Sequence, residues 1–131
     1  MNPSLVGSEM CIRDSNKTGS IEIDPKNDFY DYESKYFDDG QTKHIIPPRI
    51  SQQQVDFVEK FALEAHNALG CNGISRTDFI LEKKSGIFYI LEVNTQPGMT
   101  PTSLVPEIAK FHGISFDELI NWILNDASTN R

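Results

Sequence analysis

Cysteine, basic charge and long apolar runs are all scarce in this 131-residue chain. Its two cysteines form neither a metal-ligand spacing nor a disulfide framework, so a reducing, cytoplasmic location is expected. Lysine and arginine total 12 against 19 aspartate and glutamate residues, and the net charge of −7 argues against a nucleic-acid-binding protein. No segment approaches the roughly 18 apolar residues that would span a bilayer, so no membrane protein is expected.

The remaining composition is that of one globular domain, but the first fifteen residues differ from the rest. Hydrophobic residues make up 38% of the chain, which is enough for a core. Residues 1–15 have no helical or strand periodicity, and SLVGSEMCIRDS resembles the translation of a sequencing adapter. We therefore expect residues 1–15 to be disordered and non-native, and residues 16–131 to form the domain. The alternative is a disordered native N-terminus.

The periodicity of the chain after residue 16 predicts an α+β fold. Helices are expected at residues 51–69, 103–112 and 115–124, and strands at residues 20–23, 77–83 and 87–94. Ser51 with Gln54, and Ser115 with Glu118, have the spacing of capping boxes at two of the helix starts. The last two strands flank a three-residue connection, which predicts an antiparallel hairpin.

The hairpin has a predicted register that gathers its acidic residues. If the turn centres on Ser85, Asp78 lies opposite Glu92 and Ile80 lies opposite Ile90. Alternation then predicts a core face made of Phe79, Leu81, Ile87, Tyr89, Leu91 and Val93. The other face is predicted to carry Asp78, Ile80, Glu82, Phe88, Ile90, Glu92 and Asn94.

Two carboxylates that face each other across a strand pair repel, and a divalent cation would reverse that interaction. Oxygen ligands such as Asp78, Glu92 and Asn94 are those that Mg²⁺ prefers. The spacing alone leaves two alternatives open. Both carboxylates could lie on a solvated face, or they could pair with Arg76 and Lys83.

Groups that bind anions lie close to these carboxylates in the sequence. Arg76 projects from the same face as Asp78 and can neutralise a phosphate or an oxyanion. Gly98 lies in the following loop, where its amide can approach a ligand closely. Ser103 opens a helix whose first amides suit a carboxylate, although it could equally be a helix cap only. This combination favours phosphoryl or acyl-phosphate chemistry.

Four segments in the same order resemble the C-terminal part of the D-alanine–D-alanine ligase family, whose members are ATP-grasp enzymes. The segments are FYDYESKY (29–36), GCNGISRTDFILE (70–82), YILEVNTQPGMTPTSLVPEIA (89–109) and GISFDELI (113–120). The resemblance implies the C-terminal part of an ATP-grasp fold, an antiparallel sheet with flanking helices. It also implies ATP-dependent joining of two D-alanines through an acyl phosphate, for peptidoglycan synthesis.

The resemblance also implies specific roles for the hairpin and its exit loop. Asp78, Glu92 and Asn94 would hold two Mg²⁺ or Mn²⁺ ions against the ATP phosphates. Arg76 and the Gly98 amide would stabilise an oxyanion.

Substrate contacts are implied in the same way. Ser103 and the Leu104 amide would bind the carboxylate of the second D-alanine. Lys35 would meet the phosphates and Tyr36 would help to close a loop over the site. The positions implied for adenine are Phe29 and Ile80. Phe29 and Tyr36 could instead be packing aromatics, the commoner role of such residues.

The family pattern includes N-terminal and central domains that do not fit before residue 20. We therefore expect a fragment with negligible ligase activity by itself, from a family whose full-length members are often homodimers. Two other functions stay open: a stand-alone nucleotide- or metal-binding module, and another ATP-grasp carboxylate–amine ligase. The histidines His44, His66 and His112 are predicted to be surface residues without partners.

Overall fold

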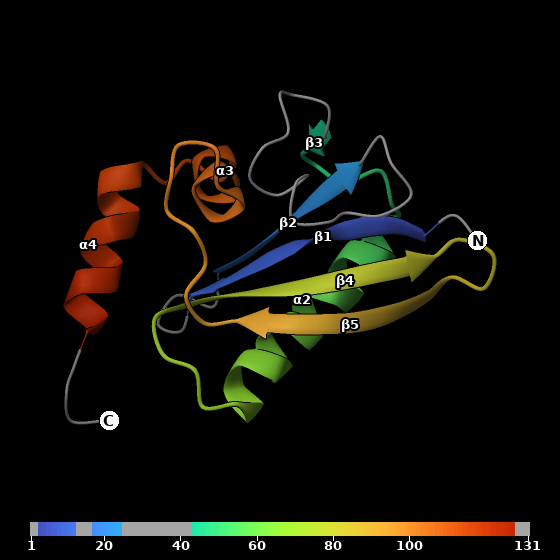
Figure 1. Cartoon of the computed structure of the whole chain (residues 1–131), viewed down its shortest axis with the longest axis horizontal. Coiled ribbons are helices and arrows are strands. Elements are labelled where there is room, and N and C mark those ends of the chain that lie inside the picture. Colours follow the sequence, from blue (N-terminus) through green and yellow to red (C-terminus); the bar gives the residue numbers. More distant parts are fainter. Residues whose placement is uncertain (1–2, 13–16, 25–42, 128–131) are drawn as a thin grey trace.

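A computed structural model describes residues 3–12, 17–24 and 43–127. One antiparallel sheet lies between helices on its two faces, which confirms the predicted α+β class (Figure 1). The strands are β1 Pro3–Ile12, β2 Lys17–Asp24, β3 Lys43–Ile45, β4 Ile74–Glu82 and β5 Ile87–Asn94. The helices are α2 Gln52–Ala68, α3 Leu104–Phe111 and α4 Phe116–Asp126.

The sheet has the strand order β3-β2-β1-β4-β5, and every neighbouring pair is antiparallel. Strand β1 lies at its centre, so the prediction that residues 1–15 are disordered is wrong for residues 3–12. The physical reason is that β2 and β4 each offer a row of backbone donors and acceptors, and backbone pairing needs no side-chain periodicity. The non-native origin of residues 1–15 stays a prediction.

One face of the sheet is covered by α3, which α4 joins in the same layer (Figure 1). Ile108 of α3 is completely buried, and so is Ile21 of β2. The buried members of this core are Ile21, Ile23, Ile74, Leu104, Val105, Ile108, Ala109, Ile114 and Leu119. This core therefore fixes the start of β4 and the beginning of α3, between which the hairpin and its exit loop run.

The opposite face of the sheet packs against α2. Val58 and Ala62 of α2 are completely buried and contact Phe79 of β4. Phe88 of β5 packs against the same cluster, with its ring edge-on to Phe79 at a centroid distance of 6.5 Å. Because Phe79 points toward α2, its neighbours on β4 point to the other face, where α3 lies.

Local sequence signals set the helix ends as expected. The capping boxes at Ser51 and Ser115 are both formed, with the side chains of Gln54 and Glu118 returning to the cap backbone. Helix α2 ends at Ala68 with Leu69 as its C-cap, and Gly70 follows with a φ of 65°, a left-handed conformation that favours glycine. These signals set where α2 and α4 begin and where α2 ends.

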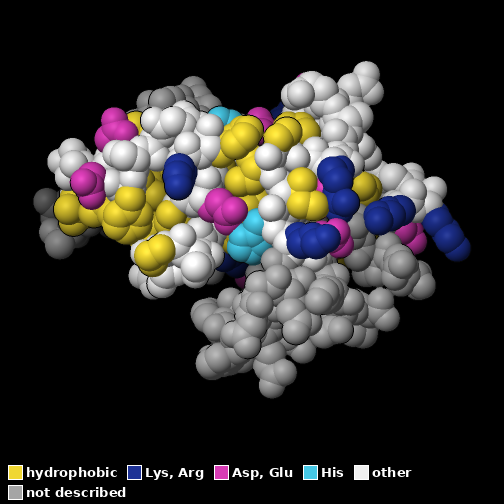
Figure 2. Space-filling view, turned by 90° about the horizontal axis from the view of Figure 1, so that it is seen from above, with side chains coloured by type: hydrophobic (Ala, Val, Ile, Leu, Met, Phe, Trp, Pro, Cys, Tyr) yellow, Lys and Arg dark blue, Asp and Glu magenta, His cyan; other side chains and the backbone are white. Residues whose placement is uncertain are grey.

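The layer of α3 and α4 leaves apolar side chains on the surface. Figure 2 shows hydrophobic side chains gathered at the α4 end of the molecule. Phe111, Phe116 and Leu124 of this layer are exposed, with Leu124 at 64%. Among the described residues, no helix is both long and apolar enough to cross a bilayer.

A buried carboxylate ties β2 to the segment before α2. Glu22 is buried, and its carboxylate accepts hydrogen bonds from the backbone N–H of Arg49 at 2.8 Å and from Arg49 Nη2 at 2.7 Å. Arg49 Nη2 also donates to Asp24 at 2.9 Å. Burial raises the pKa of Glu22, but the hydrogen bonds and charge of Arg49 outweigh it and leave that pKa below its usual value.

The lowered pKa of Glu22 predicts acid sensitivity. A carboxylate with a lowered folded-state pKa stabilises the fold above its unfolded-state pKa of about 4.3, and this contribution is lost as the pH falls through the folded-state value. Glu22→Gln is expected to lower the urea midpoint at pH 7 and to make this midpoint fall less steeply as the pH drops below about 4.5. The control is Glu64→Gln, at an exposed position on α2. It should change neither the urea midpoint at pH 7 nor the fall of that midpoint in acid. An unaltered acid slope in Glu22→Gln would contradict this assignment.

Candidate active site

The β4–β5 ladder brings the predicted polar residues together at the end of the hairpin away from its turn. Asp78 pairs with Glu92, as the sequence predicts, and Arg76 pairs with Asn94. Because Thr77 and Phe79 are buried on the α2 side, Arg76 and Asp78 point to the face that α3 covers.

Arg76 and Asp78 form a close, largely buried ion pair. Arg76 Nε lies 2.9 Å from Asp78 Oδ1, and Arg76 Nη2 lies 2.9 Å from Asp78 Oδ2. Arg76 Nη2 is also 3.5 Å from Glu92 Oε1. The side chains of Arg76 and Asp78 are only 14% and 12% exposed, against 51% for Glu92. One guanidinium therefore lies between two carboxylates, which was one of the alternatives left open by the spacing.

The hairpin register changes beyond Asp78. A bulge between Asp78 and Phe79 places Ile80 opposite Tyr89, so the predicted pairing of Ile80 with Ile90 is wrong. The cause is one extra residue on β5, which shifts every later partner by one. Phe88 consequently turns toward α2, instead of joining Ile80 on the site face.

The predicted core face is correct on β4 but wrong on much of β5. Phe79 and Leu81 are buried. Ile87, Tyr89 and Leu91 are about half exposed, at 50%, 52% and 55%. Strand β5 lies at the edge of the sheet and packs against the described helices only weakly, so its alternation does not bury a face.

The loop after β5 is held by short local hydrogen bonds. Asn94 Oδ1 accepts from the backbone N–H of Gln96 at 2.9 Å. Ser103 Oγ accepts from the backbone N–H of Thr100 at 2.9 Å and lies 2.7 Å from Thr100 Oγ1. A Cβ added at Gly98 would lie 2.9 Å from Ser103 Oγ, so the loop brings these two predicted residues together.

Ser103 takes the N-cap position of α3 without a side-chain cap hydrogen bond. Its hydroxyl faces the loop and Thr100, and Leu104, the first helical residue, is buried in the core. The first amides of α3 are therefore not capped by Ser103, which keeps this helix start suitable for an anion. Thr100 holds the Ser103 hydroxyl and was not among the predicted residues, although its position three residues before the helix cap could have indicated this contact.

The described residues test only one of the four remaining predicted positions. Phe29, Lys35 and Tyr36 lie outside the described residues. Ile80 is partly buried on β4, on the same face as Asp78.

Two of the three histidines differ from the prediction that they are partnerless surface residues. His66 of α2 is completely buried, and its Nδ1 lies 2.7 Å from Ser75 Oγ of β4. His44 Nδ1 lies 2.6 Å from Glu107 Oε2 of α3. Both partners are distant in the sequence, so a one-dimensional pattern could not reveal them. His112 is exposed, as predicted.

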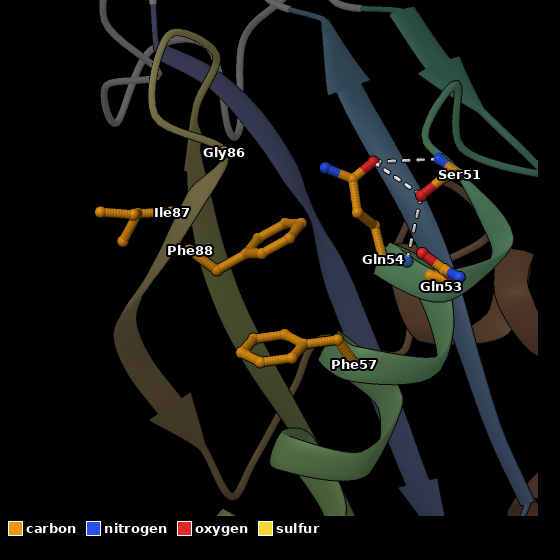
Figure 3. A pocket seen from close by; sticks show the side chains of 7 residues that line it. All are labelled: Ser51, Gln53, Gln54, Phe57, Gly86, Ile87 and Phe88. Carbon is orange, nitrogen blue, oxygen red and sulfur yellow. Dashed lines mark hydrogen bonds between the residues drawn. The ribbon is translucent and has the colours of Figure 1, made fainter.

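A surface hollow of about 360 Å³ lies elsewhere, between the start of α2 and the β4–β5 turn (Figure 3). The rings of Phe57 and Phe88 line it and stack at a centroid distance of 5.6 Å. Gln54 and Ser51 at its rim are bonded to each other in the capping box. The hollow is on the α2 side of the sheet, so it does not include the carboxylates on the α3 side.

The donor set at the hairpin end suits a small hard cation. Asp78, Glu92 and Asn94 offer only oxygen ligands, and Asp78 and Glu92 are directly opposite each other. No cluster of three or more histidine, cysteine, aspartate or glutamate side chains is found in the described part of the chain. A cation held here would therefore have two carboxylates and one amide oxygen as its ligands from this chain.

Solved structures of similar fold assign the class of the protein. The structure matches D-alanine–D-alanine ligase from Bacillus anthracis complexed with ATP with a TM-score of 0.74 at 26% identity, over 94% of this chain and 38% of that chain. VanG D-Ala:D-Ser ligase from Enterococcus faecalis matches with a TM-score of 0.74 at 32% identity, over 95% of this chain and 36% of that chain. The described fold is the C-terminal part of an ATP-grasp ligase.

Sequence comparisons then give the family. A family model described as D-ala D-ala ligase C-terminus matches residues 7–125. D-alanine–D-alanine ligase from Pelagibacter ubique is 50% identical over 123 residues, 94% of this chain and 40% of that protein. The enzyme of the same name from Xanthobacter autotrophicus is 52% identical over 114 residues, which are 85% of this chain and 37% of that protein. The chain belongs to the D-alanine–D-alanine ligase C-terminus family, and it spans about 40% of the length of these relatives.

Proposed function

We propose that this chain supplies the metal- and phosphate-binding part of an enzyme that joins two D-alanines with ATP. The observation that carries the proposal is the agreement between two independent features. Half of the residues are identical to named D-alanine–D-alanine ligases over 94% of the chain. The same chain places Arg76, Asp78 and Glu92 together on one face of the hairpin.

The proposed reaction proceeds in two steps. The γ-phosphoryl group of ATP passes to the carboxylate of the first D-alanine, which gives an acyl phosphate and ADP. The amine of the second D-alanine then attacks the acyl carbon, and the tetrahedral intermediate releases phosphate and one proton to leave D-alanyl-D-alanine. The reaction requires neutralisation of phosphate charge and precise placement of two small substrates.

The hairpin residues would hold the charges of this reaction. Asp78, Glu92 and Asn94 fit two Mg²⁺ or Mn²⁺ ions, which when bound would neutralise the ATP phosphates. The Arg76 guanidinium would donate hydrogen bonds to the developing oxyanion, together with the Gly98 amide.

The other predicted residues would bind the substrates. Ser103 and the Leu104 amide at the start of α3 would hold the carboxylate of the second D-alanine. Ile80 would contact adenine from the same face as Asp78, with Phe29 as its counterpart. We assign Lys35 to the phosphates and Tyr36 to closure over the site.

Gly98→Ala tests the assignment of the substrate carboxylate. The added Cβ would lie 2.9 Å from Ser103 Oγ, closer than such atoms approach, so the hydroxyl must move although Thr100 holds it. We expect the KM for the second D-alanine to rise about tenfold while ATP binding is little changed. Steady-state kinetics with varied D-alanine, on a chimera in which this chain replaces the matched segment of the Pelagibacter ubique ligase, will measure this. A KM within twofold of the parent would contradict the placement of Ser103.

The overall function is tested by a chimera in which this whole chain replaces the matched segment of the Pelagibacter ubique ligase. We expect the chimera to form D-alanyl-D-alanine and to release phosphate in a D-alanine-dependent reaction. The isolated 131-residue chain should show negligible ligase activity. A folded chimera that binds ATP without forming dipeptide would contradict the proposal.

Two alternative functions predict other outcomes of the same assays. A stand-alone nucleotide- or metal-binding module would bind Mn²⁺ and ATP as the isolated chain but would not support turnover in the chimera. A ligase for another acceptor, such as the D-serine named for the VanG relative, would use that acceptor in preference to D-alanine. The greater identity to the D-alanine enzymes favours D-alanine.

A further inference from the structure

We propose that Arg76 is the counter-ion that occupies Asp78 before a divalent cation binds, and that cation binding releases the Arg76 guanidinium toward the exit loop. The Arg76 guanidinium and the divalent cation would therefore bind the Asp78 carboxylate one after the other. This inference rests on the proposed function, because it concerns the cation that Asp78 and Glu92 would hold.

The first support is that the guanidinium engages both oxygens of Asp78. Nε and Nη2 of Arg76 each lie 2.9 Å from a different oxygen of that carboxylate. Such a two-point contact is the strongest geometry for an arginine–carboxylate pair, and burial of both side chains limits screening by solvent. A cation that approaches Asp78 must therefore compete with Arg76.

The second support is the position of Glu92. Its Oε1 lies 3.5 Å from Arg76 Nη2, so this nitrogen is close to both carboxylates. A cation shared by Asp78 and Glu92 would lie about 2.0–2.1 Å from an oxygen of each. It would therefore come close to the present position of Nη2, and like charges at that separation repel. The guanidinium would have to leave for the cation to bind well.

The third support is where Arg76 can go. It pairs with Asn94, the last residue of β5, so it lies at the point where the exit loop begins. Gly98 and Ser103 are brought together in that loop. A released guanidinium would lie at the end of the hairpin from which the loop with these two residues begins. Arg76 would become available for the reacting phosphate only after the cation has bound.

The experiment is a titration of the full 131-residue chain with Mn²⁺ alone, followed by electron paramagnetic resonance of the free ion. The parent, Arg76→Gln and Arg76→Lys are compared. Lys84→Gln is the matched control, because it removes one positive charge from the exposed turn of the same hairpin. Circular dichroism verifies the folding of each variant, and Arg76→Lys supplies the test if Arg76→Gln does not fold.

We expect Arg76→Gln to bind Mn²⁺ at least tenfold more tightly than the parent. Arg76→Lys should bind about threefold more tightly, since an ammonium cannot bridge both Asp78 oxygens. Lys84→Gln should stay within twofold. Mn²⁺ affinity that is unchanged or weaker in both Arg76 variants would overturn the inference.

Asp78→Asn separates this inference from the proposed function. If Asp78→Asn abolishes Mn²⁺ binding while the Arg76 variants leave it unchanged, only the inference fails. If Mn²⁺ binding persists in Asp78→Asn, the cation site itself is wrong, and the inference fails with it.

Discussion

Replacing Asp78 by Asn together with Glu92 by Gln is expected to reduce D-alanine-dependent turnover of the chimera by about 10³-fold or more. Both substitutions keep the shape of the side chain and remove its charge. Amide oxygens bind divalent cations weakly, so the phosphate charge of ATP would no longer be neutralised. The directly opposed position of the two carboxylates makes them act as a unit, so the single variants should each lose most of this activity.

Glu82→Gln is the matched control for these carboxylates. Glu82 lies on the same strand as Asp78, but near the turn, where its carboxylate accepts a hydrogen bond from Ser85. Its replacement should change turnover by less than threefold. Turnover of the double variant within tenfold of the parent chimera would remove Asp78 and Glu92 from the proposed mechanism.

The second large effect is on stability. Ile108→Ala is expected to lower the free energy of unfolding by about 3–4 kcal/mol, because Ile108 is completely buried between α3 and β2 and its truncation leaves a cavity. The whole free energy of unfolding of a domain of this size is roughly 5–15 kcal/mol, so the variant should unfold at a much lower urea concentration. Since Ser103 is the N-cap of α3, the same variant should also loosen the exit loop.

Two variants act as controls for Ile108→Ala. Ile108→Val keeps most of the volume and should cost about 1 kcal/mol. Leu124→Ala removes a side chain that is 64% exposed and should change the free energy of unfolding by less than about 0.5 kcal/mol. A loss below 1 kcal/mol in Ile108→Ala would contradict the packing of α3 on the sheet.

The sequence predicted those features that depend on neighbouring residues. The capping boxes at Ser51 and Ser115 specify helix starts through contacts three residues apart, and both are formed. The pairing of Asp78 with Glu92 was predicted as well, but the register at the turn alone would place Asp78 opposite Leu91. The bulge between Asp78 and Phe79 restores the predicted pair.

The features that the sequence did not predict depend on distant partners. Strand β1 is stabilised by β2 and β4 on its two sides, and no pattern within residues 3–12 indicates this. The burial of His66 depends on Ser75 in another element. The bulge next to Asp78 and the exposure of Tyr89 follow from the edge position of β5, which only the sheet order reveals.

Residue types and their spacing predicted only part of the candidate site. The spacing predicted that Asp78 and Glu92 lie together, but it did not indicate whether a cation or Arg76 is their partner. The structure has Arg76 on both oxygens of Asp78. The roles of Phe29, Lys35 and Tyr36 came from the family resemblance and remain predictions.

The most direct measurement is anomalous X-ray diffraction at the manganese edge, from crystals of the chimera soaked with Mn²⁺ and a non-hydrolysable ATP analogue. We expect manganese density within about 2–2.3 Å of a carboxylate oxygen of both Asp78 and Glu92, in contact with the terminal phosphates. A nucleotide bound with its manganese ions away from these two carboxylates would contradict it.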